Sequence, residues 1–464
     1  MTATATLKRT TFRTSREMDF FSEKELTTQT GHPIEEWPYV FLKEAVDNAL
    51  DACEEADIPP VVNITADPCG ITVTDNGPGI PDETLQGALD FTIRASNREM
   101  YVAPDRGAQG NALMTLLSMP YVLDPEHGRL LVTTNGVRHD IVCRADPISQ
   151  QAIVQDHPID VAETQGTEIR IEWGEHHDQD DEAMWPFGDD FYPLWQKPVR
   201  RQFFFLIHGY SFLNPHLSIT VDWFGETTSI EATDCNWSKW KPNKPTSPHW
   251  YEPRHLERLI AAYISHDRNQ STDRTVAEFV KEFDGLSGTK KRKLVLEESG
   301  LSRTKLSELA TEEGLKTEAI TVLLESMKTH TRIVKAPRLG VIGREHLAVR
   351  LEGLGCDPEQ IEYSKIDRVD DGIPFVLESA FGWMGDNAPD QRHIFAGANW
   401  SPGINNPFRS FGQNGEGLEA TLSQQRAGAY EPIVFMLHLA HPRVEYADRG
   451  KSAIVIGSDD ESAC

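Results

Sequence analysis

The chain has 464 residues, too many for one ordinary core, and its 39% hydrophobic and 25% charged content is that of a soluble globular protein with several domains. A net charge of −27 argues against a free-standing nucleic-acid binder, which would be basic overall. Six scattered cysteines lack the spacing of a zinc module, and no apolar run approaches the roughly 18 residues of a membrane span, so we expect a cytoplasmic protein without a leader or a membrane segment.

Residues 1–35 are polar and rich in threonine, which predicts an N-terminal arm that orders only against another element. The next stretch, FLKEAVDNALDACEEA at 41–56, repeats apolar residues at helical spacing. Its opposite stripe carries Glu44, Asn48 and Asp51 at positions i, i+4 and i+7. This stripe predicts either a nucleotide- and metal-binding face or an ordinary solvated surface.

Two glycine motifs follow. The alternation in 61–67 and 71–77 predicts two strands, and the second runs into the turn Asp75-Asn76-Gly77-Pro78-Gly79. A helix is expected from Pro81, and GAQGNA at 107–112 opens another, where backbone N–H groups can bind phosphate. Further strands, the last at 167–173, complete an expected α+β sandwich with helices on one face of a mixed sheet. Each motif alone is weak, because glycine and proline are ordinary turn residues.

The remainder of the chain divides at changes of pattern. Residues 236–253 are rich in Trp, Pro and Lys without a period, which predicts a linker. From 254 to about 335 nearly every stretch, including SRTKLSELATEEG at 302–314, has helical spacing and predicts a small all-helical domain. After Pro337 short apolar runs predict a third, α/β domain. The expected boundaries are an arm at 1–35 and domains at 36–252, 253–336 and 337–464.

In order and spacing, EAVDN, DNGPG, RGAQGNA and Gly166-Thr167 resemble the four motifs of the GHKL ATPases, which share the Bergerat nucleotide-binding fold. The longer stretches EAVDNALDACEEADIPP and YSFLNPHLSITVDWFG are similar to segments of the B subunit of topoisomerase VI, a type IIB DNA topoisomerase. The resemblance implies a GHKL ATP-binding domain at 36–252, a helix-two-turn-helix-like domain at 253–336 and a transducer-like domain at 337–464.

The resemblance also implies roles for individual residues. Glu44 is expected to be the general base that activates water, and Asn48 to bind the nucleotide and Mg²⁺ through its amide oxygen. Asp75 is expected to accept the adenine amine with support from Thr167, while Gly77 and Gly79 let the backbone approach ATP. The expected phosphate-binding residues are Arg106, Gly107, Gln109, Gly110 and Asn111, with a lid at 94–106 and Lys451 reaching the γ-phosphate. For Asp51 a structural partnership with a lid or strand residue is as well supported as a nucleotide contact.

Two functions remain open at this point. The first is the ATPase component of a type IIB topoisomerase-like complex, which closes as an ATP-dependent homodimer on duplex DNA and acts with a DNA-cleaving partner that resembles the A subunit of topoisomerase VI. The sequence departs from that family at Ala112, and it stops about a dozen residues after Lys451, where the family continues into a long helix. The alternative is therefore a GHKL ATPase clamp of a DNA-processing or defence system without strand passage. The cluster Lys290–Lys293 is either a DNA-phosphate contact or a solvated helix start.

Overall fold

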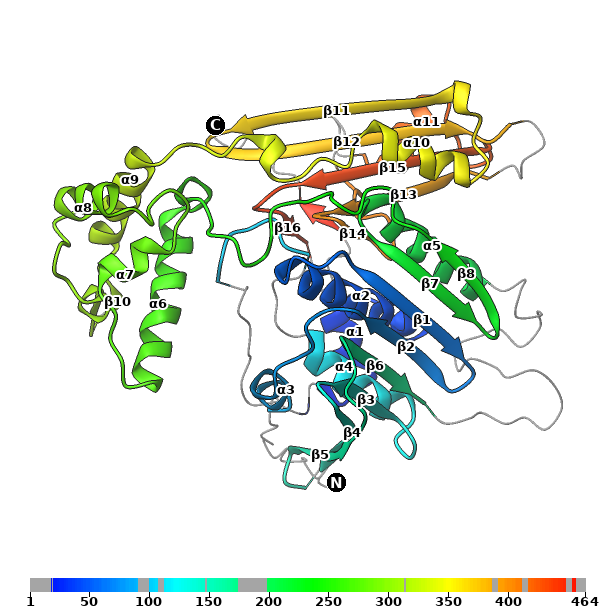
Figure 1. The fold of residues 1–464 in the computed structure, drawn as a ribbon, viewed down its shortest axis with the longest axis horizontal. Coiled ribbons are helices and arrows are strands. Elements are labelled where there is room, and N and C mark those ends of the chain that lie inside the picture. The colour runs from blue at the N-terminus through cyan, green and yellow to red at the C-terminus, as the bar shows by residue number, and fades with distance from the viewer. Residues whose placement is uncertain are drawn as a thin grey trace, which may run out of the picture.

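The computed structural model describes residues 18, 20–90, 100–106, 112–146, 148–173, 198–312, 314–385, 391–410, 416–447 and 453–455. These residues form two large β-sheets with their helices, two small two-stranded sheets, and a separate group of helices that projects to one side (Figure 1). The α+β multidomain class predicted from the sequence is confirmed.

The larger sheet has eight strands in the order β5-β4-β3-β6-β2-β1-β7-β8. Only the β1–β7 pair is parallel, so the sheet is mixed, as predicted. Its strands are β1 (Val61–Asp67), β2 (Gly70–Asp75), β3 (Arg129–Thr134), β4 (Val137–Asp146), β5 (Gln151–Asp160), β6 (Thr167–Glu172), β7 (Ser218–Trp223) and β8 (Glu226–Ile230). The adjacency of β6 and β2 brings Thr167 beside the end of β2, although about ninety residues separate them.

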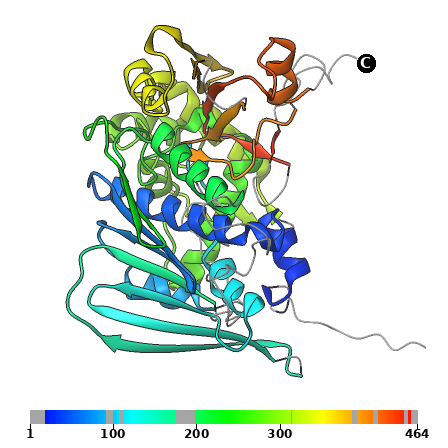
Figure 2. The ribbon, with the colours of Figure 1, turned by 90° about the vertical axis from the view of Figure 1, so that its right-hand side faces the viewer.

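Helices cover one face of this sheet, and α2 crosses it in the layer below the second sheet (Figures 1 and 2). They are α1 (Glu23–Thr30), α2 (Trp37–Glu55), α4 (Ala112–Leu123) and α5 (Pro198–Leu213), with the short α3 (Asp82–Ala88) after the first glycine turn. In α2, Phe41, Leu42 and Val46 are fully buried, which confirms the predicted apolar stripe. Pro38 stands in the first turn of α2, where its missing N–H is not needed.

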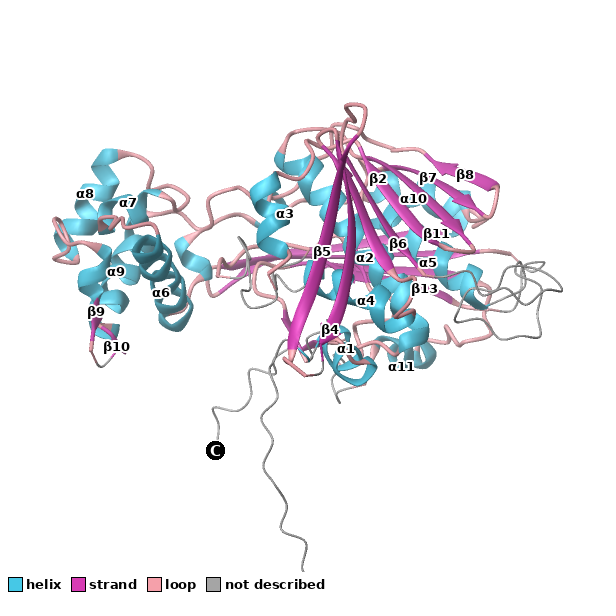
Figure 3. Ribbon diagram, turned by 90° about the horizontal axis from the view of Figure 1, so that it is seen from below, coloured by secondary structure: helices cyan, strands magenta, loops and turns pink. Residues whose placement is uncertain are grey.

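The projecting group contains α6 (Pro253–Asn269), α7 (Val276–Lys281), α8 (Thr289–Glu298) and α9 (Thr317–His330), well apart from the larger sheet in Figure 3. The prediction that this region is all helical is wrong for residues 302–314. That segment has one 3-10 turn at Leu306–Leu309 and then a small hairpin of β9 (Ala310–Thr311) and β10 (Gly314–Leu315). The buried Leu306 and Leu309 are three residues apart, which a 3-10 turn satisfies as well as an α-helix does.

The second sheet follows the order β11-β12-β15-β13-β14. Its strands are β11 (Ile361–Asp370), β12 (Ile373–Trp383), β13 (His393–Ala398), β14 (Ser401–Pro402) and β15 (Ile433–Ala440); α10 (Arg344–Gly353), α11 (Leu418–Gln424), β16 (Glu445–Tyr446) and β17 (Ile454–Val455) accompany it. Strands β12, β13 and β15 coincide with the predicted apolar runs. Strand β11 was not predicted, because it is an edge strand exposed along most of its length.

The segment predicted as a linker is not an exposed connection. Trp240, Trp250 and Tyr251 are buried in the core that the helical group shares with the second sheet, and the two indole rings meet edge to face at 4.8 Å. Pro and Lys made the stretch look solvated, whereas its aromatic residues join two domains. No helix of the described residues is both long and apolar enough to span a membrane.

Candidate functional site

Helix α2 presents Glu44 and Asn48 one turn apart. Glu44 is partly buried and Asn48 is exposed, and no described residue forms a hydrogen bond with either side chain. The apolar residues between them anchor the helix in the core, so these two polar groups are held at its surface on a rigid element. A carboxylate and an amide oxygen are thus available to a ligand.

The glycine turn after β2 is organised by the carboxylate of Asp75. Its Oδ1 accepts the N–H of Gly77 at 2.7 Å and the N–H of Thr167 at 3.2 Å. Both hydrogen bonds fall on one oxygen, which leaves Oδ2 without a donor among the described residues. Burial raises the pKa of Asp75, and the two backbone N–H groups oppose that rise only in part. Asp75 therefore offers a partly buried acceptor to a ligand.

Asn76 fixes the turn to the sheet. Its Oδ1 accepts the N–H of Val61 at 2.9 Å, and its Nδ2 donates to the carbonyl of Pro59 at 3.0 Å. Gly166 closes the other side with a φ of +84°, and a Cβ built there would lie 1.9 Å from the carbonyl oxygen of Asp75. Only glycine fits at this crossing of two strand ends.

The two glycines of the turn also lie in close contact with other side chains of the protein. A Cβ on Gly77 would lie 2.9 Å from Asp75 Oδ1, and one on Gly79, whose φ is +84°, would lie 2.5 Å from Asn135 Oδ1. Asn135 in turn donates to the carbonyl of Ile80 at 2.9 Å. The sequence-based reason for these glycines was approach to a nucleotide, and for Gly79 packing against the β3–β4 turn is a second, independent reason.

Arg106 is fully buried and lies against α2. Its guanidinium donates to Asp51 at 2.6 Å, to both carboxylate oxygens of Glu54 at 2.7 and 2.6 Å, and to Asn214 Oδ1 at 2.6 Å. Burial alone would lower the pKa of Arg106, but Glu54 and Asp51 raise it above its usual value. Of the two roles left open for Asp51, the geometry supports the structural partnership. In this arrangement the guanidinium of Arg106 is buried and paired with Asp51, Glu54 and Asn214, and none of these contacts supports the predicted role of Arg106 in phosphate binding.

Glu54 lies at the centre of this buried cluster. Besides Arg106 it contacts His216 Nε2 at 3.0 Å and Lys239 Nζ at 2.9 Å. Burial by itself would raise the pKa of Glu54, but the charges of Arg106 and Lys239 hold it well below its usual range. No sequence pattern identified His216 or Lys239 as partners of Glu54, because both lie at least 162 residues away in the chain.

A family model described as "Histidine kinase-, DNA gyrase B-, and HSP90-like ATPase" matches residues 35–174, which contain α2, the Asp75 turn and Thr167. Residues 35–174 are a GHKL ATPase domain.

Several curated proteins named as the B subunit of type 2 DNA topoisomerase 6 are similar to the chain. The protein of Thermococcus kodakarensis is 31% identical over 98 residues, 20% of this chain and 17% of the relative. That of Archaeoglobus fulgidus is 45% identical over 73 residues, 15% and 12% of the two chains. That of Methanococcoides burtonii is 26% identical over 440 residues, which cover 89% of this chain and 64% of the relative. The resemblance to the B subunit of topoisomerase VI is thus confirmed, and the matches span less than two thirds of these relatives.

Among solved structures, the ATPase region of Saccharomyces cerevisiae topoisomerase II is similar to 90% of this chain and 77% of its own, with a TM-score of 0.37 and 10% identity.

A second network fastens the GHKL domain to the second sheet. Asp47 of α2 accepts hydrogen bonds from Tyr210 Oη at 2.9 Å and from Ser401 Oγ at 2.7 Å, and Lys43 Nζ lies 2.7 Å from its Oδ2. Lys43 also donates to Ser401 of β14. The neighbours of Glu44 and Asn48 on α2 therefore bond directly to the second sheet. None of these contacts was predicted from the sequence, although Lys43 and Asp47 stand at the i, i+4 spacing of a helical ion pair.

Part of the predicted site lies outside the described residues. This holds for the lid up to residue 99, for Lys451, and for the phosphate-loop residues Gly107, Gln109, Gly110 and Asn111. Strands β16 and β17 pair on either side of the segment that contains Lys451. Within the described ranges no group of three His, Cys, Asp or Glu side chains could hold a metal ion. The roles of these residues and the cytoplasmic location stay predictions.

Proposed function

We propose that this chain is the ATP-binding and ATP-hydrolysing component of a type IIB DNA topoisomerase-like complex. The observation that carries the proposal is the Asp75 carboxylate, whose Oδ1 is saturated by two backbone N–H groups while Oδ2 is left to accept from a ligand. Asp75 belongs to the GHKL domain, and the same domain presents the side chains of Glu44 and Asn48 on α2, where a ligand can reach them.

Asp75 is proposed to recognise adenine. The exocyclic amine of adenine is a hydrogen-bond donor, and the free Oδ2 is an acceptor held in position by the contacts on Oδ1. Because Asp75 is partly buried, this hydrogen bond is shielded from water and is stronger than an exposed one. Guanine presents a carbonyl acceptor at the equivalent position, so the site should favour ATP over GTP.

Glu44 is proposed to orient and deprotonate the attacking water, since a carboxylate fixed on a buried helix can be positioned for that role. Asn48, one turn further along, is proposed to hold Mg²⁺ through its amide oxygen, a ligand type that suits this cation. Mg²⁺ supplies charge neutralisation at the phosphates when bound. Lys451 is proposed to contact the γ-phosphate from the C-terminal region.

The ATPase role is tested by Glu44→Gln, which should leave ATP binding within about twofold of the parent and abolish turnover, because the isosteric amide cannot accept a proton. Glu318→Gln makes the same change on an exposed helix start in the helical group and should leave turnover unaltered. Substantial hydrolysis by Glu44→Gln would show that another group activates the water.

The wider activity is proposed from the similarity to the B subunit of topoisomerase VI, which extends over 89% of this chain. We propose an ATP-dependent homodimer that encloses duplex DNA, uses the N-terminal arm in dimerisation, and acts with a DNA-cleaving partner of the kind that the A subunit of topoisomerase VI represents. Plasmid relaxation with ATP and the partner purified from native cells is the direct test. ATP-dependent DNA binding with no relaxation would instead indicate a clamp without strand passage.

The start of α8 is proposed to contribute to DNA binding. Lys290, Lys291 and Lys293 are exposed there, and each phosphate contact adds about one unit to the dependence of log K on log salt. The pair Lys290→Glu and Lys291→Glu should lower duplex affinity and reduce that slope. A matched control reverses Lys365 and Arg368, which are exposed on β11. An equal response of both double variants would point to overall charge instead of a local contact.

A further inference from the structure

Residues 100–106, here called the strap, lie within the GHKL domain in sequence and contact the helical group through their side chains. They precede the predicted phosphate-binding loop in the sequence, yet Met100, Tyr101 and Val102 pack against the core of the helical group and second sheet, not against the core of the GHKL domain. The strap therefore belongs to the GHKL domain in sequence and to its neighbours in packing.

The first end of the strap is held by tyrosines. The hydroxyl of Tyr101 is hydrogen-bonded to that of Tyr263 on α6, and the two rings meet edge to face at 6.5 Å. Tyr263 also donates to Glu282, just after α7, and the Arg274 guanidinium lies 4.0 Å from the centre of its ring. The backbone N–H of Val102 donates to Tyr251 Oη at 3.1 Å. A movement of Tyr101 would thus be transmitted to both α6 and the end of α7.

The second end of the strap is held in the GHKL domain by Arg106. Its ion pair with Asp51 at 2.6 Å fastens the strap to α2, three residues from Asn48. Just before it, the carbonyl of Asp105 accepts from Asn399 Nδ2 at 3.4 Å, and Asn399 Oδ1 accepts the N–H of His441 at 2.9 Å. The strap is thus fixed to α2 at one end, to α6 at the other, and to the second sheet between them.

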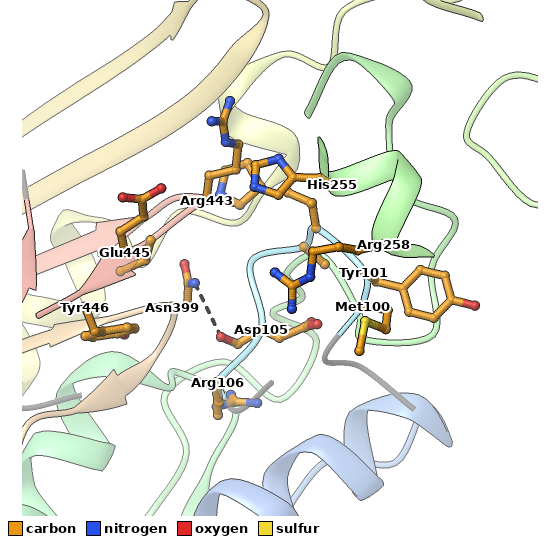
Figure 4. A pocket seen from close by; sticks show the side chains of 14 residues that line it. Met100, Tyr101, Asp105, Arg106, His255, Arg258, Asn399, Arg443, Glu445 and Tyr446 are labelled. Atoms are coloured by element: carbon orange, nitrogen blue, oxygen red, sulfur yellow. Dashed lines mark hydrogen bonds between the residues drawn. The ribbon is translucent and has the colours of Figure 1, made fainter. Parts of the chain in front are cut away.

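A cavity of about 240 Å³ lies beside the strap and is walled on its other sides by α6 and by residues that follow β15 (Figure 4). Arg258 extends from α6 into the space above Asp105, while His255 and Arg443 lie together at the opposite rim. Glu445 and Tyr446 complete the wall on the side of the second sheet. Since one flank of the strap is open, a small displacement would disrupt fewer packing contacts than in a filled core.

We propose that the strap couples the nucleotide site directly to the helical group, with Tyr101 and Tyr263 as the positioning residues of this link. The inference rests on the proposed binding of ATP at Asp75 and Asn48. Nucleotide that orders this site fixes Arg106 and the strap, and the Tyr101–Tyr263 hydrogen bond passes the restraint to α6 and α7. This route is separate from the predicted Lys451 contact and from the Asp47–Ser401 contact with the second sheet.

The test is hydrogen exchange of the full chain, with and without Mg²⁺ and a non-hydrolysable ATP analogue. In the parent protein the analogue should slow exchange around Asp75 and Thr167, and also in α6 and α7, by about fivefold or more. Tyr101→Phe removes only the hydroxyl on the strap and leaves the Tyr263–Glu282 hydrogen bond in place. In this variant the analogue should no longer slow exchange in α6 and α7, so that the ratio of the rates without and with analogue is about one, while the nucleotide site stays protected.

Tyr363→Phe is the matched control for the loss of one hydrogen-bonded tyrosine hydroxyl, because the hydroxyl of Tyr363 donates to Glu378 at 2.8 Å within the second sheet. It should respond to the analogue as the parent does. Tyr263→Phe is a second variant at the same link and should reproduce the loss seen with Tyr101→Phe.

Unchanged protection of α6 and α7 in Tyr101→Phe overturns the inference. Protection of the nucleotide site alone in the parent protein also overturns it, and leaves the proposed function intact. Absence of protection around Asp75 in the parent protein overturns the proposed function, and the coupling with it.

Discussion

Replacing Gly166 by alanine tests whether the contact between β2 and β6 forms the adenine-binding end of the site. The residue has a φ of +84°, and its added Cβ would lie 1.9 Å from the carbonyl oxygen of Asp75, so the backbone of one strand end must move by more than an ångström. The left-handed conformation costs a residue with a Cβ about 1–2 kcal/mol, and overpacking adds about 1–3 kcal/mol. We expect the free energy of unfolding to fall by about 2–5 kcal/mol.

Gly225 provides the matched control, because its φ is +89° and a Cβ there meets no atom within 4 Å. Gly225→Ala should cost only the conformational part, about 1–2 kcal/mol. The difference between the unfolding free energies of the two variants, measured in urea, then gives the cost of the steric overlap at the carbonyl oxygen of Asp75.

Nucleotide affinity is the second measurement for this pair. Displacing Asp75 from Thr167 weakens a charge-assisted hydrogen bond worth about 1.5–3 kcal/mol, so ADP should bind at least about tenfold more weakly to Gly166→Ala and normally to Gly225→Ala, by calorimetry. Equal unfolding free energies and equal ADP affinities in the two variants would refute the assigned role of this crossing.

Two further predictions concern charge. Burial raises the pKa of Asp75, and adenine should bind the ionised carboxylate, so the affinity for ADP should fall as the pH is lowered through that raised pKa. The variant Asp75→Asn should bind ADP about 10–100-fold more weakly at neutral pH and should lose this pH dependence. An ADP affinity of the parent protein that does not change with pH would contradict the assignment. Arg106→Met removes the cationic partner of the buried carboxylates of Asp51 and Glu54 and should lower the free energy of unfolding by about 3–5 kcal/mol. The control Arg200→Met should lower it by less than about 1 kcal/mol, because the partner of Arg200, Glu226, is 66% exposed. Similar losses in these two arginine variants, measured by urea unfolding, would mean that the Arg106 cluster is solvated.

Local patterns were enough to predict the elements that carry the site. In α2 the apolar spacing determines which side is buried, so Glu44 and Asn48 are at the surface in any fold that buries Phe41 and Val46. The strand and turn that end in Asp75 were predicted for the same reason, since alternation and turn residues act over a few positions. The motif spacing then indicated the GHKL family, which the match over residues 35–174 confirms.

Local patterns failed where a residue's environment comes from a distant segment. Residues 302–314 have spacing compatible with both helix and 3-10 turn, and the packing of Leu306 and Leu309 decides between them. Strand β11 has no buried face to produce an apolar pattern, so only its pairing with β12 defines it.

By itself, the sequence determined that α2 has an apolar stripe and an opposite polar stripe with Glu44 and Asn48, and that a turn follows Asp75, because periodicity and turn chemistry act within one element. Only the tertiary structure decided that Asp51 pairs with Arg106, that Gly166 must lack a Cβ, and that Tyr101 is bonded to α6. Each of these depends on groups between about 55 and 162 residues apart in the chain, and no local pattern encodes which distant segments will meet.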